Sequence, residues 1–129
     1  MLTKLKLAEN LNTSPETLVL LAKDGKWGVR YYVARNPNTS PETLALLARD
    51  RSWSIRYAVT KNPNISPETL ALLAKDKEFA VRYSVTENSN TPSEILILLI
   101  KDENRQLSDI AFNNPNLPNE YKMLYLLKK

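Results

Sequence analysis

The segment Asn36–Asp50 reads Asn-Pro-Asn-Thr-Ser-Pro-Glu-Thr-Leu-Ala-Leu-Leu-Ala-Arg-Asp, and Asn62–Asp76 repeats it with two changes. A close variant occupies Asn10–Asp24 and a looser one occupies Asn88–Asp102, so each copy begins 26 residues after the previous one. A fixed period of this length is typical of a solenoid or repeat array, in which each unit buries its apolar face against its neighbours.

The first half of each copy predicts a short helix. Serine at positions 14, 40 and 66 is a favourable N-cap, and the proline that follows suits the first helical position, where no N–H is needed. In the fourth copy the stretch Thr91-Pro92-Ser93-Glu94 predicts a capping box, with the helix start shifted by one residue. Apolar residues nearly encircle the Leu-Ala-Leu-Leu-Ala body, so we expect this helix to be largely buried.

The second half of each copy predicts another helix. The aspartates at positions 24, 50, 76 and 102 end the apolar run of the first helix and are well placed to cap the second helix. The pairs Val29–Val33, Ile55–Val59 and Val81–Val85 have i,i+4 spacing and predict a stripe that faces the core. Asparagine closes the helix at positions 36, 62, 88 and 114, and this residue tolerates the left-handed conformation that ends many helices.

These elements predict an all-α chain of about four and a half two-helix repeats, because no sustained alternation supports strands. We expect one repeat domain over residues 1–129. Residues 1–9 form an N-terminal capping helix, the repeats are 10–35, 36–61, 62–87 and 88–113, and residues 114–129 form a C-terminal half-repeat cap.

Composition excludes most familiar catalytic chemistries. The 129 residues include no Cys, no His and only two Gly, which removes thiol nucleophiles, the commonest general base and glycine-rich phosphate loops. Acidic clusters such as Asp102-Glu103 fall in turns without a neighbouring nucleophile. We therefore expect no enzyme activity, no catalytic residue, no metal and no cofactor.

The chain shows no apolar run long enough for a signal peptide or a membrane span, so we expect a cytoplasmic protein without membrane contact. The formal net charge of +4 is uneven, because residues 1–62 carry ten Lys or Arg against five Asp or Glu. An acidic partner in the first half is one interpretation of this excess, and ordinary solubilising charge is the other.

The sequence of residues 36–59 resembles the leucine-rich repeat variant (LRV) type of repeat. The segments Asp24 to Arg30, Asp50 to Arg56 and Asp76 to Arg82 are also similar to the second helix of HEAT repeats. The resemblance implies a right-handed α-solenoid, an α–α superhelix, in which alternate helices are short or 3₁₀ and Asp and Arg form polar ladders between repeats.

Known activities of related proteins carry over weakly. One LRV protein type holds an iron–sulfur cluster in a cysteine-rich segment, which a chain without cysteine cannot do. Some HEAT-like proteins are alkylpurine DNA glycosylases, but their domains are nearly twice this long, and no catalytic motif of theirs matches here.

Three columns of side chains recur once per repeat on the second helix, and the aromatic ones fall roughly opposite the core stripe. They are Arg30, Arg56 and Arg82; Trp27, Trp53 and Phe79; and Tyr31, Tyr57 and Tyr83. The columns either bind a partner or serve the scaffold, the arginines by pairing with the Asp column and the rings by filling the seam between repeats. In the fourth copy Ser108 replaces the arginine, and Arg105 and Asp109 replace the two aromatic residues. This change marks either the end of a binding surface or the packing of a C-terminal cap.

The predicted function is a non-catalytic scaffold that binds a protein or peptide through these nine residues. The alternative is nucleic-acid binding through the basic first half and the same columns. The C-terminal helix, expected from Glu120 to Lys129, carries Met123, Leu126 and Leu127, which either cover the fourth repeat or join two copies in a homo-oligomer.

Overall fold

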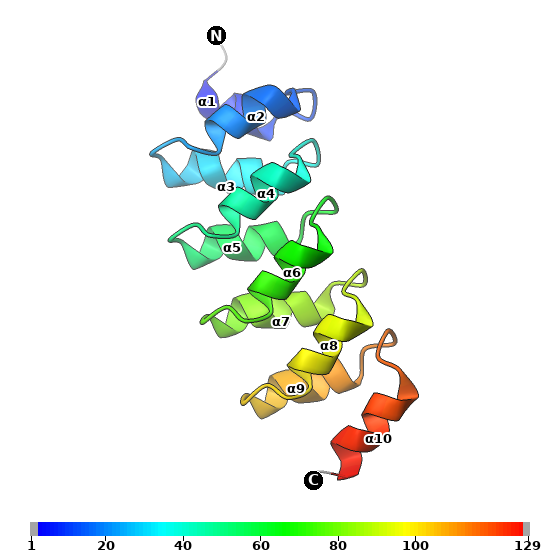
Figure 1. Ribbon diagram of the computed structural model, residues 1–129. Helices are drawn as coiled ribbons and strands as arrows, with labels where there is room; N and C mark the ends of the chain where they lie inside the picture. Colours follow the sequence, from blue (N-terminus) through cyan, green and yellow to red (C-terminus); the bar gives the residue numbers. More distant parts are fainter. Residues whose placement is uncertain (1–2, 128–129) are drawn as a thin grey trace. The chain divides into compact units, whose positions relative to one another are not determined.

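The computed structural model describes residues 3–127, and this part of the chain contains helices and turns but no strand (Figure 1). Ten helices follow one another: α1 (Lys4–Glu9), α2 (Pro15–Leu21), α3 (Trp27–Arg35), α4 (Pro41–Leu47), α5 (Trp53–Thr60), α6 (Pro67–Leu73), α7 (Phe79–Glu87), α8 (Ser93–Leu99), α9 (Arg105–Phe112) and α10 (Asn119–Leu127). Equivalent helices start 26 residues apart, at Trp27 and Trp53 for example. The predicted fold class, an all-α solenoid of two-helix repeats, is confirmed.

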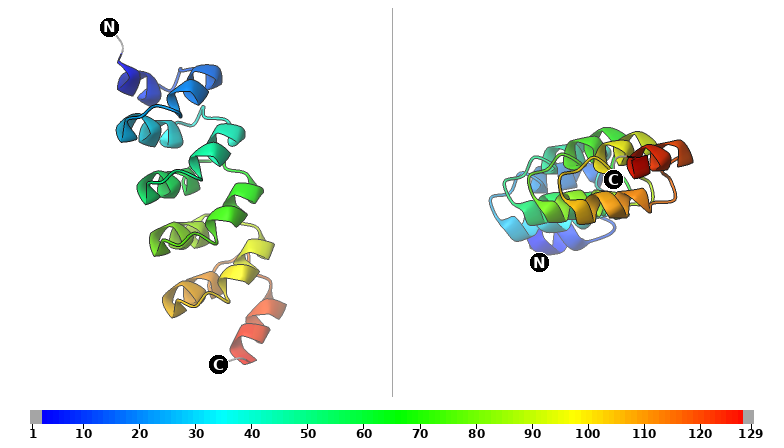
Figure 2. Two further views of the ribbon diagram at one scale, coloured as in Figure 1. Left: turned by 60° about the vertical axis from the view of Figure 1, so that its left-hand side comes forward. Right: turned by 90° about the horizontal axis from the view of Figure 1, so that it is seen from below.

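The chain divides into two compact units, residues 1–69 and residues 70–129. In the first unit, α3 packs against α1 on one side and α5 on the other, while α2 and α4 form a second layer (Figures 1 and 2). In the second unit, α9 packs against both α7 and α8. Within residues 3–127, no helix combines the length and the apolar character that a bilayer span requires.

The first helix of each repeat begins as the sequence predicts. The hydroxyl oxygens of Ser14, Ser40 and Ser66 each accept a hydrogen bond of 3.2 Å from the backbone N–H three residues later. The helices α2, α4, α6 and α8 are seven residues long, so the expectation of short helices holds. They are α-helical rather than 3₁₀.

The capping box predicted in the fourth copy is wrong. Helix α8 starts at Ser93, 52 residues after Pro41, so its start is not shifted, and its N-cap Pro92 makes no side-chain bond. The Thr91 hydroxyl instead donates to the Val85 carbonyl at 2.7 Å. Thr13 and Thr39 make the same bond to Leu7 and Val33, which shows that this hydroxyl ties the turn to the preceding helix.

The expected burial of the leucine-rich helix holds for one face only. Leu18, Leu21, Leu44 and Leu47 are buried, but Leu20 and Leu46 are 69% and 45% exposed. A helix of this kind packs through one stripe, so the middle one of its three leucines lies outside that stripe and is exposed. The core stripe of the second helix is confirmed, since the Val and Ile residues of the three i,i+4 pairs are at most 4% exposed.

The aspartates do not cap the second helix as expected. The N-cap residues are Lys26 and Ser52, which lie two residues further on and make no side-chain cap bond. Asp24 and Asp50 instead accept the N–H of these residues through Oδ1, each at 2.9 Å. This local turn leaves the second carboxylate oxygen free for a more distant partner.

The left-handed ending predicted for the asparagines is also wrong, because no residue of the described part has a positive φ. Asn36 has φ −73° and is buried. Its Nδ2 donates to the carbonyls of Ala8 at 2.8 Å and Asn10 at 2.9 Å, and Asn62 donates in the same way to Ala34 and Asn36. The last turn of a helix leaves its carbonyls unpaired, and the amide of the next repeat satisfies them.

A second amide per repeat adds to this set of bonds. Asn38 Nδ2 donates to Leu11 and Thr13, and Asn64 Nδ2 donates to Pro37 and Thr39. In the second unit, Asn114 donates to the Thr86 carbonyl at 2.9 Å. We call the bonds of Asn36, Asn38, Asn62, Asn64, Asn114 and Asn116 to the preceding repeat the asparagine ladder.

The asparagine ladder predicts that Asn36→Asp lowers the free energy of unfolding by about 3 kcal/mol, because a carboxylate oxygen then faces two buried carbonyl oxygens. The variant keeps the acceptor that Asn38 N–H uses. Asn10→Asp is the matched control, since Asn10 closes α1 as Asn36 closes α3 but is exposed. Urea unfolding at neutral pH measures both, and equal losses would contradict this role for the ladder.

Candidate partner-binding face

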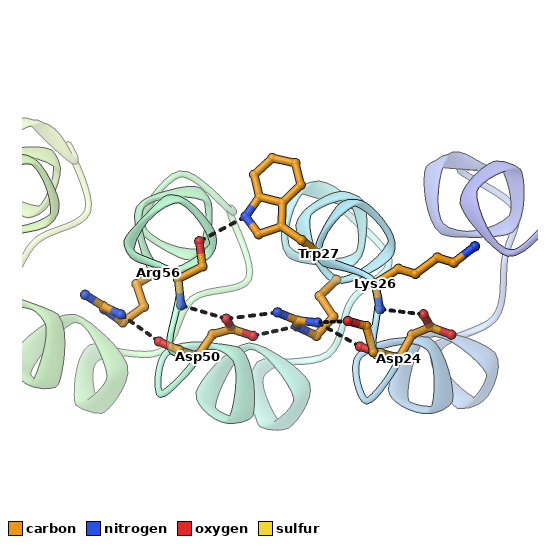
Figure 3. A network of polar contacts seen from close by, with 8 residues as sticks. Asp24, Lys26, Trp27, Asp50 and Arg56 are labelled. Carbon is orange, nitrogen blue, oxygen red and sulfur yellow. Dashed lines mark hydrogen bonds and ion pairs between the residues drawn. The ribbon is translucent and has the colours of Figure 1, made fainter.

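In the first unit, the arginine column is part of a buried ion-pair network (Figure 3). Arg30 Nε donates to Asp50 Oδ2 at 2.8 Å, and Arg30 Nη1 donates to the Asp24 carbonyl at 2.9 Å. The side chains of Arg30 and Asp50 are 9% and 8% exposed. The guanidinium therefore joins the turn of its own repeat to the carboxylate of the next.

Arg56 is buried in the same position of the next repeat, and its Nη1 donates to the Asp50 carbonyl at 2.6 Å (Figure 3). In the second unit, Arg82 Nε donates to Asp102 Oδ2 at 3.0 Å and Arg82 Nη1 donates to the Asp76 carbonyl. The inter-repeat Asp–Arg pairing implied by the HEAT resemblance is thus present at Arg30 and Arg82. Partner contact by the three arginines stays a prediction.

The first rung of this arginine–aspartate ladder uses a lysine. Lys4 lies 26 residues before Arg30, and its Nζ forms an ion pair of 2.9 Å with Asp24 Oδ2. The Lys26 N–H and then the Lys4 ammonium lower the pKa of Asp24 below its ordinary value of 3.8.

In this ladder each cation pairs with an aspartate 20 residues later in the chain. The residue 20 positions after Ser108 is Lys128, which could not pair with an arginine at position 108. Ser108 in place of arginine therefore matches the end of the ladder.

The aromatic columns of the first unit are more exposed than its arginines. Trp27 and Trp53 are 48% and 46% exposed, so about half of each residue is open to solvent. Trp27 stacks on Tyr31 with ring centroids 5.0 Å apart and planes 10° apart. Its Nε1 donates to Ser52 Oγ at 2.9 Å, which fixes the ring against the next repeat (Figure 3).

Two cations, Arg35 and Lys61, extend these aromatic pairs, and neither is among the site residues predicted from the sequence. Arg35 Cζ lies 5.7 Å from the centroid of the Tyr31 ring, and Lys61 Nζ lies 5.2 Å from that of Tyr57. Both side chains belong to exposed residues, and neither forms an ion pair within residues 3–127. The spacing i, i+4, i+8 from each Trp through Tyr to the cation was the available signal.

These side chains line one cavity between α3 and α5. The cavity holds about 370 Å³ and is lined by Tyr31, Arg35, Tyr57, Ala58 and Lys61. We call it the tyrosine–cation groove. It joins two aromatic faces to two positive charges that have no ion-pair partner among the described residues. This combination suits anionic or π-rich groups, and its lining residues include no usual nucleophile or general base.

The second unit carries a different version of this face. Phe79 and Tyr83 pack with centroids 5.8 Å apart and are only partly exposed. Glu87 takes the position that Arg35 and Lys61 occupy in their repeats, so the charge there is reversed. The cationic groove is therefore a property of the first unit.

In the fourth copy, Asp109 and its neighbour Phe112 contact helix α10. The Tyr125 hydroxyl donates to the Asp109 carboxylate, and the rings of Phe112 and Tyr125 lie 4.9 Å apart. Asp109 thus serves the C-terminal cap, which favours the second of the two alternatives left open by the sequence. Met123, Leu126 and Leu127 are exposed on α10, so oligomerisation through this helix stays a prediction. Lys128 and Lys129, the expected end of the helix, lie outside the described residues.

The acidic clusters have structural partners. Asp102 accepts from Arg82 and from the N–H of Asn104, and Asp76 accepts from the N–H of Glu78. This agrees with their interpretation as turn residues rather than as an acid–base pair.

A comparison with protein families matches residues 27–52 to the model of the leucine rich repeat variant. This match starts at α3, ends before α5 and covers one 26-residue period, so the predicted repeat type is confirmed. A search of curated proteins and a search of solved structures each found no match to the chain. The repeat type is that of a structural scaffold, and it specifies no partner.

The buried rung of the arginine–aspartate ladder predicts that Asp50→Asn lowers the free energy of unfolding by about 3 kcal/mol, because it leaves the Arg30 guanidinium buried without a counter-charge. Asp24→Asn is the matched control. Both substitutions keep the turn acceptor, but the Lys4 side chain is 69% exposed and can return to water. Urea denaturation should give a clearly smaller loss for the control, and the reverse order would contradict the buried ladder.

The lowered pKa of Asp24 predicts a pH-dependent contribution to stability. Because the folded pKa lies below the ordinary 3.8, the contribution is present above that value and is lost as the pH falls through the folded pKa. Thermal unfolding of the wild type and Asp24→Asn should therefore differ at about pH 6, and the difference should shrink as the pH falls below 3.8. A difference that grows on acidification would contradict the pairing.

Proposed function

We propose that this chain is a non-catalytic repeat scaffold that binds a protein or peptide partner through the aromatic face of α3 and α5. The observation that carries the proposal is the exposure of Trp27 and Trp53, each about half exposed and packed on a tyrosine whose ring also contacts a cation. Trp, Tyr and Arg dominate the energetics of protein interfaces because they combine large apolar area with polar anchoring groups. Side chains whose only role is to pack one repeat against the next would be buried.

The scaffold prepares this face for binding. The asparagine ladder and the Arg30–Asp50 pair fix consecutive repeats to one another, and the Trp27–Ser52 bond fixes an exposed ring. A partner then loses less binding free energy to the ordering of the surface. Repeat proteins commonly use such a fixed surface, whose side chains vary while the stack is kept.

Nucleic-acid binding is the second candidate, since cations beside aromatic rings also hold single strands. It is less well supported, because Arg30 and Arg56 are buried and bonded within the protein. Among residues 3–127, the exposed cations that lie over tyrosine rings of α3 and α5 are Arg35 and Lys61.

The proposal predicts that Trp53→Ala weakens partner binding by at least about tenfold. The test uses the immobilised full chain to capture proteins from an extract of the cells that make it, followed by titration of each captured protein. Leu20→Ala is the matched control, because it removes an exposed apolar side chain from α2 in the same unit.

A partner that binds Leu20→Ala like the wild type but is lost with Trp53→Ala supports the proposed face. Equal capture by the wild type and by Trp53→Ala, with both folded by circular dichroism, would contradict it. Recovery of single-stranded nucleic acid alone, with affinity falling steeply with salt, would favour the second candidate.

A further inference from the structure

We propose that the tyrosine–cation groove binds an acidic segment in the polyproline II conformation, with two carboxylates three residues apart. The inference rests on the proposed function and names the chemistry of the partner. Its starting point is the pair Arg35 and Lys61, which neither ladder uses.

The charge of the groove specifies an anionic partner. Arg35 and Lys61 are exposed, and each lies over a tyrosine ring without a carboxylate within ion-pair distance among residues 3–127. A cation held over a ring keeps its outer donors available for a second group. An arginine guanidinium in addition matches a carboxylate with two parallel hydrogen bonds.

The spacing of the two cations specifies the conformation of the partner. Arg35 and Lys61 occupy equivalent positions of neighbouring repeats, at the C-terminal ends of α3 and α5, which pack against each other. Packed helices lie about 8–10 Å apart, so the two positions are separated by a similar distance. A polyproline II segment brings residues i and i+3 to one side about 9 Å apart. A β-strand places residues of one side about 7 or about 13 Å apart, and neither value fits.

The lining of the groove suits such a segment. The rings of Tyr31 and Tyr57 line a cavity of about 370 Å³, and Ala58 is also part of its wall. The equivalent residue of the preceding repeat is Tyr32, so the small side chain of Ala58 leaves this space open. Aromatic-lined grooves bind polyproline II segments because proline rings pack on flat aromatic faces and the peptide is already ordered.

The test is a titration of the full chain with three fluorescent peptides that share the same flanking residues. Their central sequences are Glu-Pro-Pro-Glu, Pro-Glu-Glu-Pro and Gln-Pro-Pro-Gln, so charge and spacing vary separately. Fluorescence anisotropy reads binding at low and high salt. We expect Glu-Pro-Pro-Glu to bind at least about tenfold more tightly than the other two. Equal binding of all three peptides, or no binding of any, overturns the inference, and equal binding of the two acidic peptides overturns the conformation.

Charge-reversal variants locate the site. Arg35→Glu and Lys61→Glu should each weaken binding of Glu-Pro-Pro-Glu by at least about tenfold, since an attraction becomes a repulsion. Arg49→Glu is the matched control, because it changes the charge of the same unit equally at an exposed residue after α4. A loss with Arg49→Glu as large as with Arg35→Glu overturns the assignment to the groove.

The outcomes separate this inference from the proposed function. If no peptide binds but Trp53→Ala still abolishes partner capture, the acidic segment is overturned and the binding face stands. If a single-stranded oligonucleotide binds through Arg35 and Lys61 and the peptides do not, the groove is a nucleic-acid site and the inference is overturned.

Discussion

The structure depends on the need of each repeat to satisfy the backbone carbonyls that the preceding repeat leaves unpaired. Helices of six to nine residues end often, and every end leaves carbonyls without partners. Asn36 and Asn62 meet this need with buried amides that reach back to the preceding repeat. Because such a bond is strongly favoured only when both partners are in register, the asparagine ladder fixes the period as well as the packing.

The same constraint decides which side chains are left for function. Arg30 and Asp50 form a buried ion pair between neighbouring repeats, where an unpaired charge would be costly. Trp27, Tyr31 and Arg35 lie on one face of α3, outside both ladders. The arginines that stand out when the repeats of this chain are aligned are thus used within the scaffold. Arg35 and Lys61 stay exposed.

The sequence predicts what local physics determines. Serine caps and the valine stripe of the second helix depend on neighbours within a few residues, and both are found. The role of Asn36 could not be derived in this way, since its acceptors lie 26 and 28 residues away. The exposure of Leu20 was missed because the pattern does not tell which side of an apolar helix is covered. Lys61 was missed although its spacing from Tyr57 is visible in the sequence.

The central claim is that the arginines of the ladder belong to the stack while Arg35 belongs to the binding face. Nuclear magnetic resonance of the ¹⁵N-labelled arginine Nε–H groups tests it directly during titration with the Glu-Pro-Pro-Glu peptide. Arg30 and Arg56 are buried and bonded, so their signals should exchange slowly with water and stay unchanged. The Arg35 signal should shift on addition of peptide. A shift of Arg30 or Arg56 with an unchanged Arg35 would contradict this account.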